Sequence, residues 1–225
     1  GFSVLAIDTD PQTNFTYTAG LQPEETELDL YNLFKGQGSS LQAIQTTKAG
    51  FDMIAGSLQL AGADMEFTMT GREYILKGII EPIKERYDYC IIDTPPTLGI
   101  LTINALTASE RVLVPMGADV YSLQGLSQLQ GMIENVRKYC NPSLIIEGLL
   151  LTKYNSRAVI NRQLKDSLED VAHRLNTKLF KTCIREAVAV KEVQFLQGNI
   201  FDEYPNANIT RDYIEFIKEF TGKDF

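Results

Sequence analysis

Histidine, cysteine and long apolar runs are scarce in this chain of 225 residues. Its three cysteines, Cys90, Cys140 and Cys183, are widely spaced and form no CxxC pair, which argues against a disulfide framework or a metal cluster and fits a reducing cytoplasm. The single histidine, His173, has no partners for a catalytic triad or a set of metal ligands. No apolar run approaches the roughly 20 residues that span a bilayer. The sequence therefore predicts a cytoplasmic protein that does not enter membranes.

The composition is that of an ordinary globular protein, with 44% hydrophobic and 22% charged residues. We find no internal repeat, low-complexity segment or linker, so we expect one domain over residues 1–225. The chain starts at Gly1 and enters an apolar run almost at once, without the pattern of a signal peptide. We therefore expect a fragment, or a chain that has lost its beginning.

Two short apolar runs each lead into acidic residues. The run Val4–Ile7 precedes Asp8 and Asp10, and the run Tyr89–Ile92 precedes Asp93. Runs without alternation suit strands that are buried on both faces of a parallel sheet, and ligands bind beyond the carboxyl ends of such strands. Carboxylates at that edge suit a magnesium ion and an oriented water. For either run alone, ordinary Asp-Pro turn chemistry is an equal alternative.

Strand and helix patterns alternate along the rest of the chain. This alternation predicts an α/β fold with a mostly parallel twisted sheet that is flanked by helices on both faces. Further strands are expected at 51–55, 111–116, 144–151 and, at an edge, 178–180, and helices at 28–34, 41–47, 71–86, 97–109, 122–139, 160–175, 188–197 and 209–220.

The charges are unevenly distributed. The net charge is −8, yet residues 153–191 carry nine basic and four acidic side chains. A solvated helix face and a patch for phosphate backbones both explain such a segment. The nine basic residues are Lys153, Arg157, Arg162, Lys165, Arg174, Lys178, Lys181, Arg185 and Lys191.

The residues around the acidic strand ends resemble a known family. The sequences DTDPQ at 8–12 and IIDTPP at 91–96 are similar to those of the ParA/MinD group of P-loop ATPases, in particular the ParA partition branch. The resemblance extends over nearly the whole chain and implies a P-loop NTPase-like fold. Further matches lie at 52–57 with 60–64, 114–116 with 121–126, 148–157, and 184–187 with 191–192.

The resemblance assigns roles to the acidic residues. It implies that Asp10 positions and activates the attacking water, and that Asp93 holds Mg²⁺ through a water as a Walker B carboxylate does. Asp8 would complete the metal site as a supporting carboxylate.

The resemblance also implies two binding surfaces. Thr152, Lys153, Tyr154 and Asn155 would line the adenine pocket for ATP, with Lys153 and Tyr154 as the main contacts. Arg185 matches a position that helps the family bind double-stranded DNA without sequence preference, and Lys181 and Lys191 would join it. The implied partners are nucleoid DNA, a ParB-like protein that stimulates hydrolysis, and a second copy in an ATP-bound dimer.

The sequence departs from this family at one place. A KGGxGKT-type phosphate loop on a preceding strand is absent from these 225 residues, although its backbone N–H groups and lysine normally hold the phosphates. We therefore expect the chain by itself to bind ATP weakly and to hydrolyse it negligibly. The lysine that reaches across the family's dimer is absent with the loop, and loss of the strand would expose sheet edges.

Other readings have less support. A non-enzymatic DNA-binding or partner-binding relative would not need both Asp10 and Asp93. The membrane-binding MinD branch would need a basic face on the last helix, and residues 212–220 lack one. A nitrogenase-reductase relative needs cluster cysteines, and Cys90 in a buried strand suits that poorly. A glycosyltransferase DxD motif at Asp8–Asp10 would leave the second acidic strand unexplained.

Overall fold

The computed structural model describes residues 1–117, 119–155 and 159–223. The chain separates into two compact units, which are described one at a time. The first unit comprises Gly1–Ser109, Asn135–Pro142 and Leu196–Gly198, and the second comprises Glu110–Glu134, Ser143–Phe195 and Asn199–Phe225. The single domain expected over residues 1–225 stays a prediction.

The first unit contains a four-stranded sheet in the order β2-β3-β1-β4. Strands β1 (Val4–Asp8), β3 (Asp52–Ile54) and β4 (Tyr89–Asp93) are parallel, and β2 (Ile44–Thr46) is antiparallel to β3. The pairing of β1 with β4 runs from Val4 opposite Tyr89 to Asp8 opposite Asp93. The two acidic strand ends are therefore neighbours at the carboxyl edge of the sheet, the edge at which the sequence predicts them.

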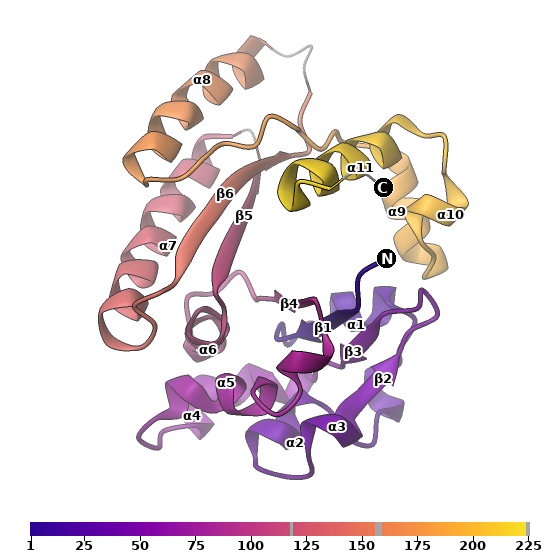
Figure 1. The fold of residues 1–225 in the computed structure, drawn as a ribbon, viewed down its shortest axis with the longest axis vertical. Helices are drawn as coiled ribbons and strands as arrows, with labels where there is room; N and C mark the ends of the chain where they lie inside the picture. Colours follow the sequence, from indigo (N-terminus) through magenta and orange to yellow (C-terminus); the bar gives the residue numbers. More distant parts are fainter. Residues whose placement is uncertain (118, 156–158, 224–225) are drawn as a thin grey trace. The chain divides into compact units, whose positions relative to one another are not determined.

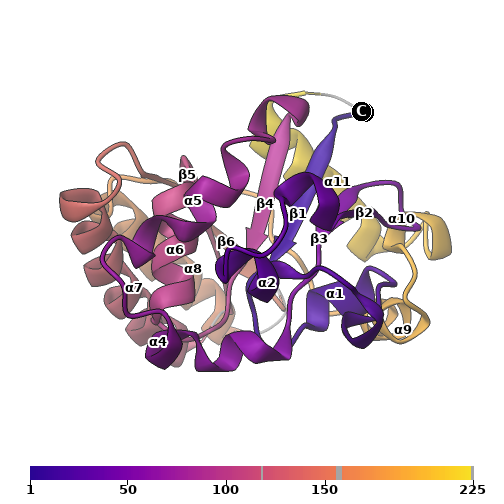
Figure 2. The same ribbon diagram turned by 90° about the horizontal axis from the view of Figure 1, so that it is seen from below.

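Helices cover one face of this sheet and form the core of the first unit. Leu5 and Ile7 of β1 are fully buried among side chains of α2 (Leu30–Phe34), α5 (Ile75–Ile80) and α6 (Ile100–Ala108). Burial of one such side chain contributes about 1.5–3 kcal/mol. Figure 1 shows α2, α3 (Ser40–Ala43) and α5 below the strands, and Figure 2 views them from that side.

The burial predicted for β4 is wrong. Cys90 is exposed and Ile91 is 53% exposed, whereas β1 is buried from Leu5 to Asp8. The reason is the position of β4 in the sheet. Among the described strands it pairs with β1 alone, so its other edge does not receive a neighbour that would bury it.

The second unit is built on the parallel pair β5 (Arg111–Gly117) and β6 (Ile145–Thr152). Figure 1 shows the first part of α7 (Val120–Tyr139) and α8 (Val159–Arg174) on one side of this pair and α11 (Asn208–Thr221) on the other. Leu150, Phe180 and Ile184 pack against α11 in a buried cluster. The mostly parallel sheet flanked by helices is confirmed.

Several short elements differ from the expectation. The helix expected at 41–47 is α3 (Ser40–Ala43) followed directly by β2, because Ile44, Gln45 and Thr46 pair with β3. The edge strand expected at 178–180 forms an isolated bridge between Leu149 and Leu179. Within 71–86 the chain forms η3 (Arg72–Tyr74), α5 and η4 (Lys84–Arg86). The helix expected at 188–197 is α9 (Val188–Leu196). Five short elements were not expected: α1 (Asn14–Thr18), η1 (Pro23–Glu25), η2 (Leu58–Gly62), α4 (Ala63–Glu66) and α10 (Ile200–Glu203).

Among the described residues, no helix combines the length and the apolar character needed to cross a membrane.

Candidate functional site

Three carboxylates lie at or just beyond the carboxyl ends of β1 and β4. Asp8 and Asp93 are register partners, and the loop after β1 is bonded across to β4. The backbone N–H of Thr9 donates to the carbonyl of Asp93 at 2.9 Å, and the Thr9 hydroxyl donates to the same oxygen at 2.6 Å. These bonds hold the loop that carries Asp10 against the end of β4.

Asp8 organises this loop from inside the protein. It is fully buried, and its Oδ2 accepts the backbone N–H of Thr16 at 2.9 Å and the Thr16 hydroxyl at 2.7 Å. Its Oδ1 accepts the backbone N–H of Asp10 at 3.1 Å. The Thr16 hydroxyl accepts in turn from Gly56 N–H at 2.9 Å. Asp8 therefore ties the end of β1 to α1 and, through Thr16, to the residues after β3.

Gly56 lies directly against Asp8, which leaves little room for a side chain at this position. A Cβ at this position would lie 3.0 Å from the carboxyl carbon of Asp8 and 3.0 Å from its carbonyl oxygen. Such a contact forces the backbone or the carboxylate to move. The arrangement around Asp8 therefore depends on Gly56 as well as on Thr16.

The remaining two carboxylates are more accessible. Asp10 is half-buried, and its Oδ1 accepts the backbone N–H of Gln12 at 3.0 Å, which fixes an Asx turn. Asp93 is exposed at the end of β4. Partial burial of its carboxyl group, together with the carboxylates of Asp8 and Asp10, raises the pKa of Asp93 to about 6. Burial also raises the pKa of Asp8, against the opposing effect of its bonds from Thr16.

This crowding of negative charge suits a divalent cation only if other ligands contribute. In the part of the chain that the structure describes, no three His, Cys, Asp or Glu side chains are grouped so as to hold a metal ion. The buried Asp8 already accepts three hydrogen bonds. Mg²⁺ is typically bound by one or two carboxylates together with waters and substrate phosphates. Asp93 is the accessible carboxylate that fits this arrangement.

The loop after β4 is anchored by Asp64, which was not singled out as a site residue from the sequence. Asp64 Oδ1 accepts the backbone N–H of Ile100 at 2.8 Å, at the start of α6. A Cβ on Gly99 would lie 2.5 Å from Asp64 Oδ2, so this approach also requires glycine. The anchor fixes where the loop that follows Asp93 enters α6.

In the second unit, residues 152–155 follow β6. Thr152 donates through its hydroxyl to the carbonyl of Met116 at 3.3 Å. Lys153 is exposed and has a φ of 51°, a left-handed conformation that costs about 1 kcal/mol or more in a residue with a side chain and that clusters at functional sites. Tyr154 is half-buried and Asn155 is exposed.

The predicted DNA contacts also lie in the second unit. Tyr154 forms a parallel bridge with Arg185, so the base-binding and DNA-binding predictions fall on adjoining backbone. Lys181 is exposed four residues earlier, and Lys191 is exposed on α9. Arg157 lies outside the described residues, and the side chain of Arg162 is likewise not described.

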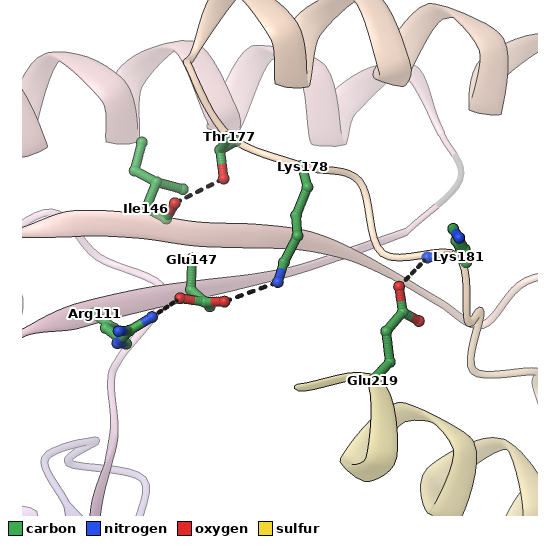
Figure 3. Close-up of polar contacts among 7 residues, drawn as sticks. All are labelled: Arg111, Ile146, Glu147, Thr177, Lys178, Lys181 and Glu219. Carbon is green, nitrogen blue, oxygen red and sulfur yellow. Dashed lines mark hydrogen bonds and ion pairs between the residues drawn. The ribbon is translucent and has the colours of Figure 1, made fainter. Parts of the chain in front are cut away.

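Two basic side chains of this segment are already paired. Lys178 Nζ lies 2.9 Å from Glu147 Oε1, and Glu147 also pairs with Arg111. Figure 3 shows this group, together with the bond from the Lys181 backbone to Glu219. Arg185 pairs with Asp212 through its Nε at 2.6 Å. The surplus of basic residues counted from the sequence is therefore partly neutralised in the structure.

Three supporting residues escaped the sequence reading. Thr16, Asp64 and Asp212 were not singled out as site residues from the sequence. Their roles come from contacts between residues at least eight positions apart. Local patterns carry no signal for such contacts.

Comparison with known proteins gives consistent results. Residues 1–146 match the family model described as an AAA domain. The chain is 38% identical over 221 residues to the sporulation initiation inhibitor protein Soj of Bacillus subtilis (strain 168), covering 97% of this chain and 86% of Soj. It is 35% identical over 196 residues to the chromosome partitioning protein ParA of Caulobacter vibrioides, covering 85% of this chain and 72% of ParA.

Solved structures agree with these relatives. A Mycobacterium smegmatis protein described as cobyrinic acid a,c-diamide synthase, with a bound ATP analog and magnesium, superposes with a TM-score of 0.81 at 28% identity, covering 100% of this chain and 86% of that one. Apo McdA from Cyanothece superposes with a TM-score of 0.86 at 23% identity, covering 99% and 88%. The second likeness concerns the fold alone.

Proposed function

We propose that this chain, which belongs to the ParA/Soj-type family of partitioning ATPases, couples binding and hydrolysis of ATP to the segregation of a chromosome, plasmid or mobile element. The observation that carries the proposal is the register of β1 and β4, which places Asp8 opposite Asp93 with Asp10 in the loop between β1 and α1. Relatives of known function and a nucleotide-bound neighbour support the same activity.

A different role is proposed for each of the three carboxylates. Asp93 is proposed to hold Mg²⁺ through a water, since it is exposed at the end of β4 and lies beside the carboxylates of Asp8 and Asp10. The metal, when bound, neutralises charge on the nucleotide phosphates. Asp10 is proposed to orient and activate the attacking water. Asp8, which is buried and accepts three hydrogen bonds, is proposed to support Asp10 by holding the backbone of its loop.

The second unit is proposed to bind the adenine of the nucleotide and the phosphate backbone of DNA. Thr152, Lys153, Tyr154 and Asn155 are proposed to line the adenine pocket. Arg185, with Lys181 and Lys191, is proposed to contact phosphates of double-stranded DNA, which positions a protein without reading bases. The Tyr154–Arg185 bridge supports a link between the two, because it joins the proposed nucleotide segment to the proposed DNA segment.

The proposal includes partners. Binding to DNA would place the protein on the nucleoid, a ParB-like protein would stimulate hydrolysis, and the ATP-bound state would be a homodimer. Such a cycle works only if ATP and its products favour different states. The KGGxGKT-type phosphate loop of the family is not among these 225 residues, so we propose that these residues by themselves bind ATP weakly and hydrolyse it negligibly.

The direct test replaces Asp10 by alanine in the full-length gene product. Asp10→Ala is expected to keep ATP binding, measured with a fluorescent ATP analogue, and to lower turnover at least about 100-fold because the water loses its orienting group. The matched control is Asp170→Ala, on the exposed surface of α8, which should leave both unchanged. Loss of nucleotide binding together with turnover would show that Asp10 has another role.

A further inference from the structure

We infer that Asp212 on α11 is a positioning residue for DNA binding: its carboxylate holds the guanidinium of Arg185 by one edge and presents the other edge to a backbone phosphate. The inference rests on the proposed contact between Arg185 and DNA. It concerns only the second unit of the molecule, which contains both residues and the elements around them.

The backbone at Arg185 is fixed on one side by β6. The N–H of Ile184 donates to the carbonyl of Leu151 at 2.8 Å, and the N–H of Tyr154 donates to the carbonyl of Ile184 at 3.0 Å. Ile184 is 4% exposed and belongs to the buried cluster beneath α11. The main chain that carries Arg185 is therefore held in place although it lies outside the helices and strands.

Helix α11 fixes the same segment on its other side with two carboxylates. Asp212 and Glu219 are seven residues apart, which places them on one face of the helix, two turns from each other. Glu219 accepts the backbone N–H of Lys181 at 2.8 Å, and the N–H and hydroxyl of Thr182 at 2.9 and 2.7 Å. Figure 3 shows the bond to Lys181. One carboxylate thus anchors the start of the segment and the other its end.

Asp212 fixes the side chain of Arg185 as well as its backbone. Oδ2 accepts the backbone N–H at 3.1 Å and Nε at 2.6 Å, and Oδ1 accepts Nη2 at 2.6 Å. A guanidinium has two edges that each offer a pair of donors. These bonds use the Nε/Nη2 edge and leave the Nη1/Nη2 edge for another acceptor. The Arg185 side chain is 47% exposed, whereas that of Asp212 is 9% exposed, so the arginine faces solvent from a buried support.

Two physical effects of Asp212 on DNA binding have opposite signs. Its negative charge repels phosphates, so counting charges predicts tighter binding when that charge is removed. Holding a long side chain in its bound conformation avoids the ordering cost of binding, so positioning predicts weaker binding when Asp212 is removed. The short bidentate contact and the burial of Asp212 favour positioning as the larger effect.

Glu215 provides a matched control for charge. It lies on α11 one turn beyond Asp212, is exposed, and acts on Arg185 through its charge. Glu215→Gln removes the same charge from the same helix. Asp212→Asn also removes one negative charge but breaks the bidentate support.

The experiment measures binding of the full-length gene product with ATP to two DNA duplexes of unrelated sequence, by fluorescence anisotropy between about 50 and 200 mM salt. Asp212→Asn is expected to weaken binding roughly two- to tenfold, the factor that corresponds to ordering one long side chain, and to lower the salt slope on both duplexes. Glu215→Gln is expected to leave binding unchanged or tighter. On an Arg185→Ala background, Asp212→Asn should cause no further weakening.

A second variant covers the case in which Asp212→Asn does not fold, as judged by circular dichroism. Arg185→Lys keeps the charge but cannot form the bidentate contact. Positioning therefore predicts weaker DNA binding by this variant, whereas charge counting predicts unchanged DNA binding. Binding by Asp212→Asn as tight as wild type, or by Arg185→Lys where that variant replaces it, overturns the inference. If Arg185→Ala itself leaves affinity and salt slope unchanged, the proposed DNA contact fails, and the inference fails with it.

Discussion

Asp8 in the first unit and Asp212 in the second are both buried aspartates that hold a neighbouring segment, and their charges are treated in opposite ways. Asp8 is bonded to backbone N–H groups and a hydroxyl, which leaves its charge without a cation, and burial raises its pKa. Asp212 is bonded to a guanidinium, which cancels its charge. Asp8 therefore belongs to an acidic site that attracts a cation, whereas Asp212 supports a cationic side chain, that of Arg185, at the surface.

The same contrast extends to the neighbours of each aspartate. Asp93 and Asp10 add negative charge beside Asp8, and among the described residues the ion pairs do not include any of the three. Beside Asp212, the pKa of Arg185 is raised by the hydrogen bonds to that aspartate. The carboxylates of Asp8, Asp10 and Asp93 therefore form a negatively charged site in the first unit, and a bound metal ion would neutralise part of that charge.

The largest effect on stability is expected when Asp8 loses its hydroxyl partner. Thr16→Val removes the hydroxyl that donates to Asp8 Oδ2 and accepts from Gly56 N–H. The buried Gly56 N–H is left without an acceptor and Asp8 loses one of its three hydrogen bonds, at about 2–4 kcal/mol together. Urea unfolding measures this loss. Thr18→Val, on the same helix and half-buried, is the control and should change stability by less than about 0.5 kcal/mol. Equal losses of stability in the two variants would show that the hydrogen bonds of the Thr16 hydroxyl to Asp8 and Gly56 do not contribute measurably to folding.

A smaller loss is expected when the space beside Asp8 is filled. Gly56→Ala places a methyl group 3.0 Å from the Asp8 carboxyl carbon, which should cost about 1–3 kcal/mol because backbone and carboxylate must shift. Gly62→Ala is the matched control, since a Cβ there meets nothing within 4 Å. Thermal unfolding of both variants decides the matter, and a Gly56→Ala protein as stable as wild type would contradict the geometry described for Asp8.

The smallest effect is a pH-dependent one at Asp93. Its pKa is raised from 3.8 to about 6 in the folded state, so between these values the folded protein binds more protons than the unfolded one, and stability contributed by this group falls as pH rises. Asp93→Asn removes that dependence. The variant should therefore gain stability over wild type at pH 7.5 relative to pH 4.5, by less than about 1 kcal/mol because water screens the exposed group.

Thermal unfolding in EDTA at the two pH values tests this prediction. The chelator removes any divalent cation that would change the ionisation of the cluster. A difference between variant and wild type that is constant with pH, or larger at pH 4.5, would contradict the assigned direction of the shift.

The parts of the fold that local patterns determine were predictable. The apolar run before Asp8 and the one before Asp93 were correctly read as strands of a parallel sheet, because uninterrupted runs and acidic ends are local features. The burial of β4 was not, because exposure of Ile91 depends on which strands flank it. Strand β2 was read as helix, since its partner β3 decides its conformation and three residues carry no clear period.

The roles assigned to the site residues stay predictions, and only their placement can be compared with the structure. The resemblance supplied candidate residues, and the structure brings Asp8, Asp10 and Asp93 together and places Tyr154 beside Arg185. The contact of Arg185 with Asp212 spans 27 positions in the sequence, and that of Asp8 with Thr16 requires the turn that precedes α1. Such contacts depend on how elements pack, which no local pattern encodes.

The most direct measurement is the affinity of the full-length gene product for a nonspecific DNA duplex with ATP and Mg²⁺, compared with ADP and Mg²⁺, at one fixed salt concentration. We predict clearly tighter binding with ATP, similar on unrelated sequences, because the nucleotide selects the state that presents Arg185 and its neighbours to phosphates. Equal affinity with ATP and ADP would contradict the claim that this protein is an ATP-dependent DNA-partitioning switch.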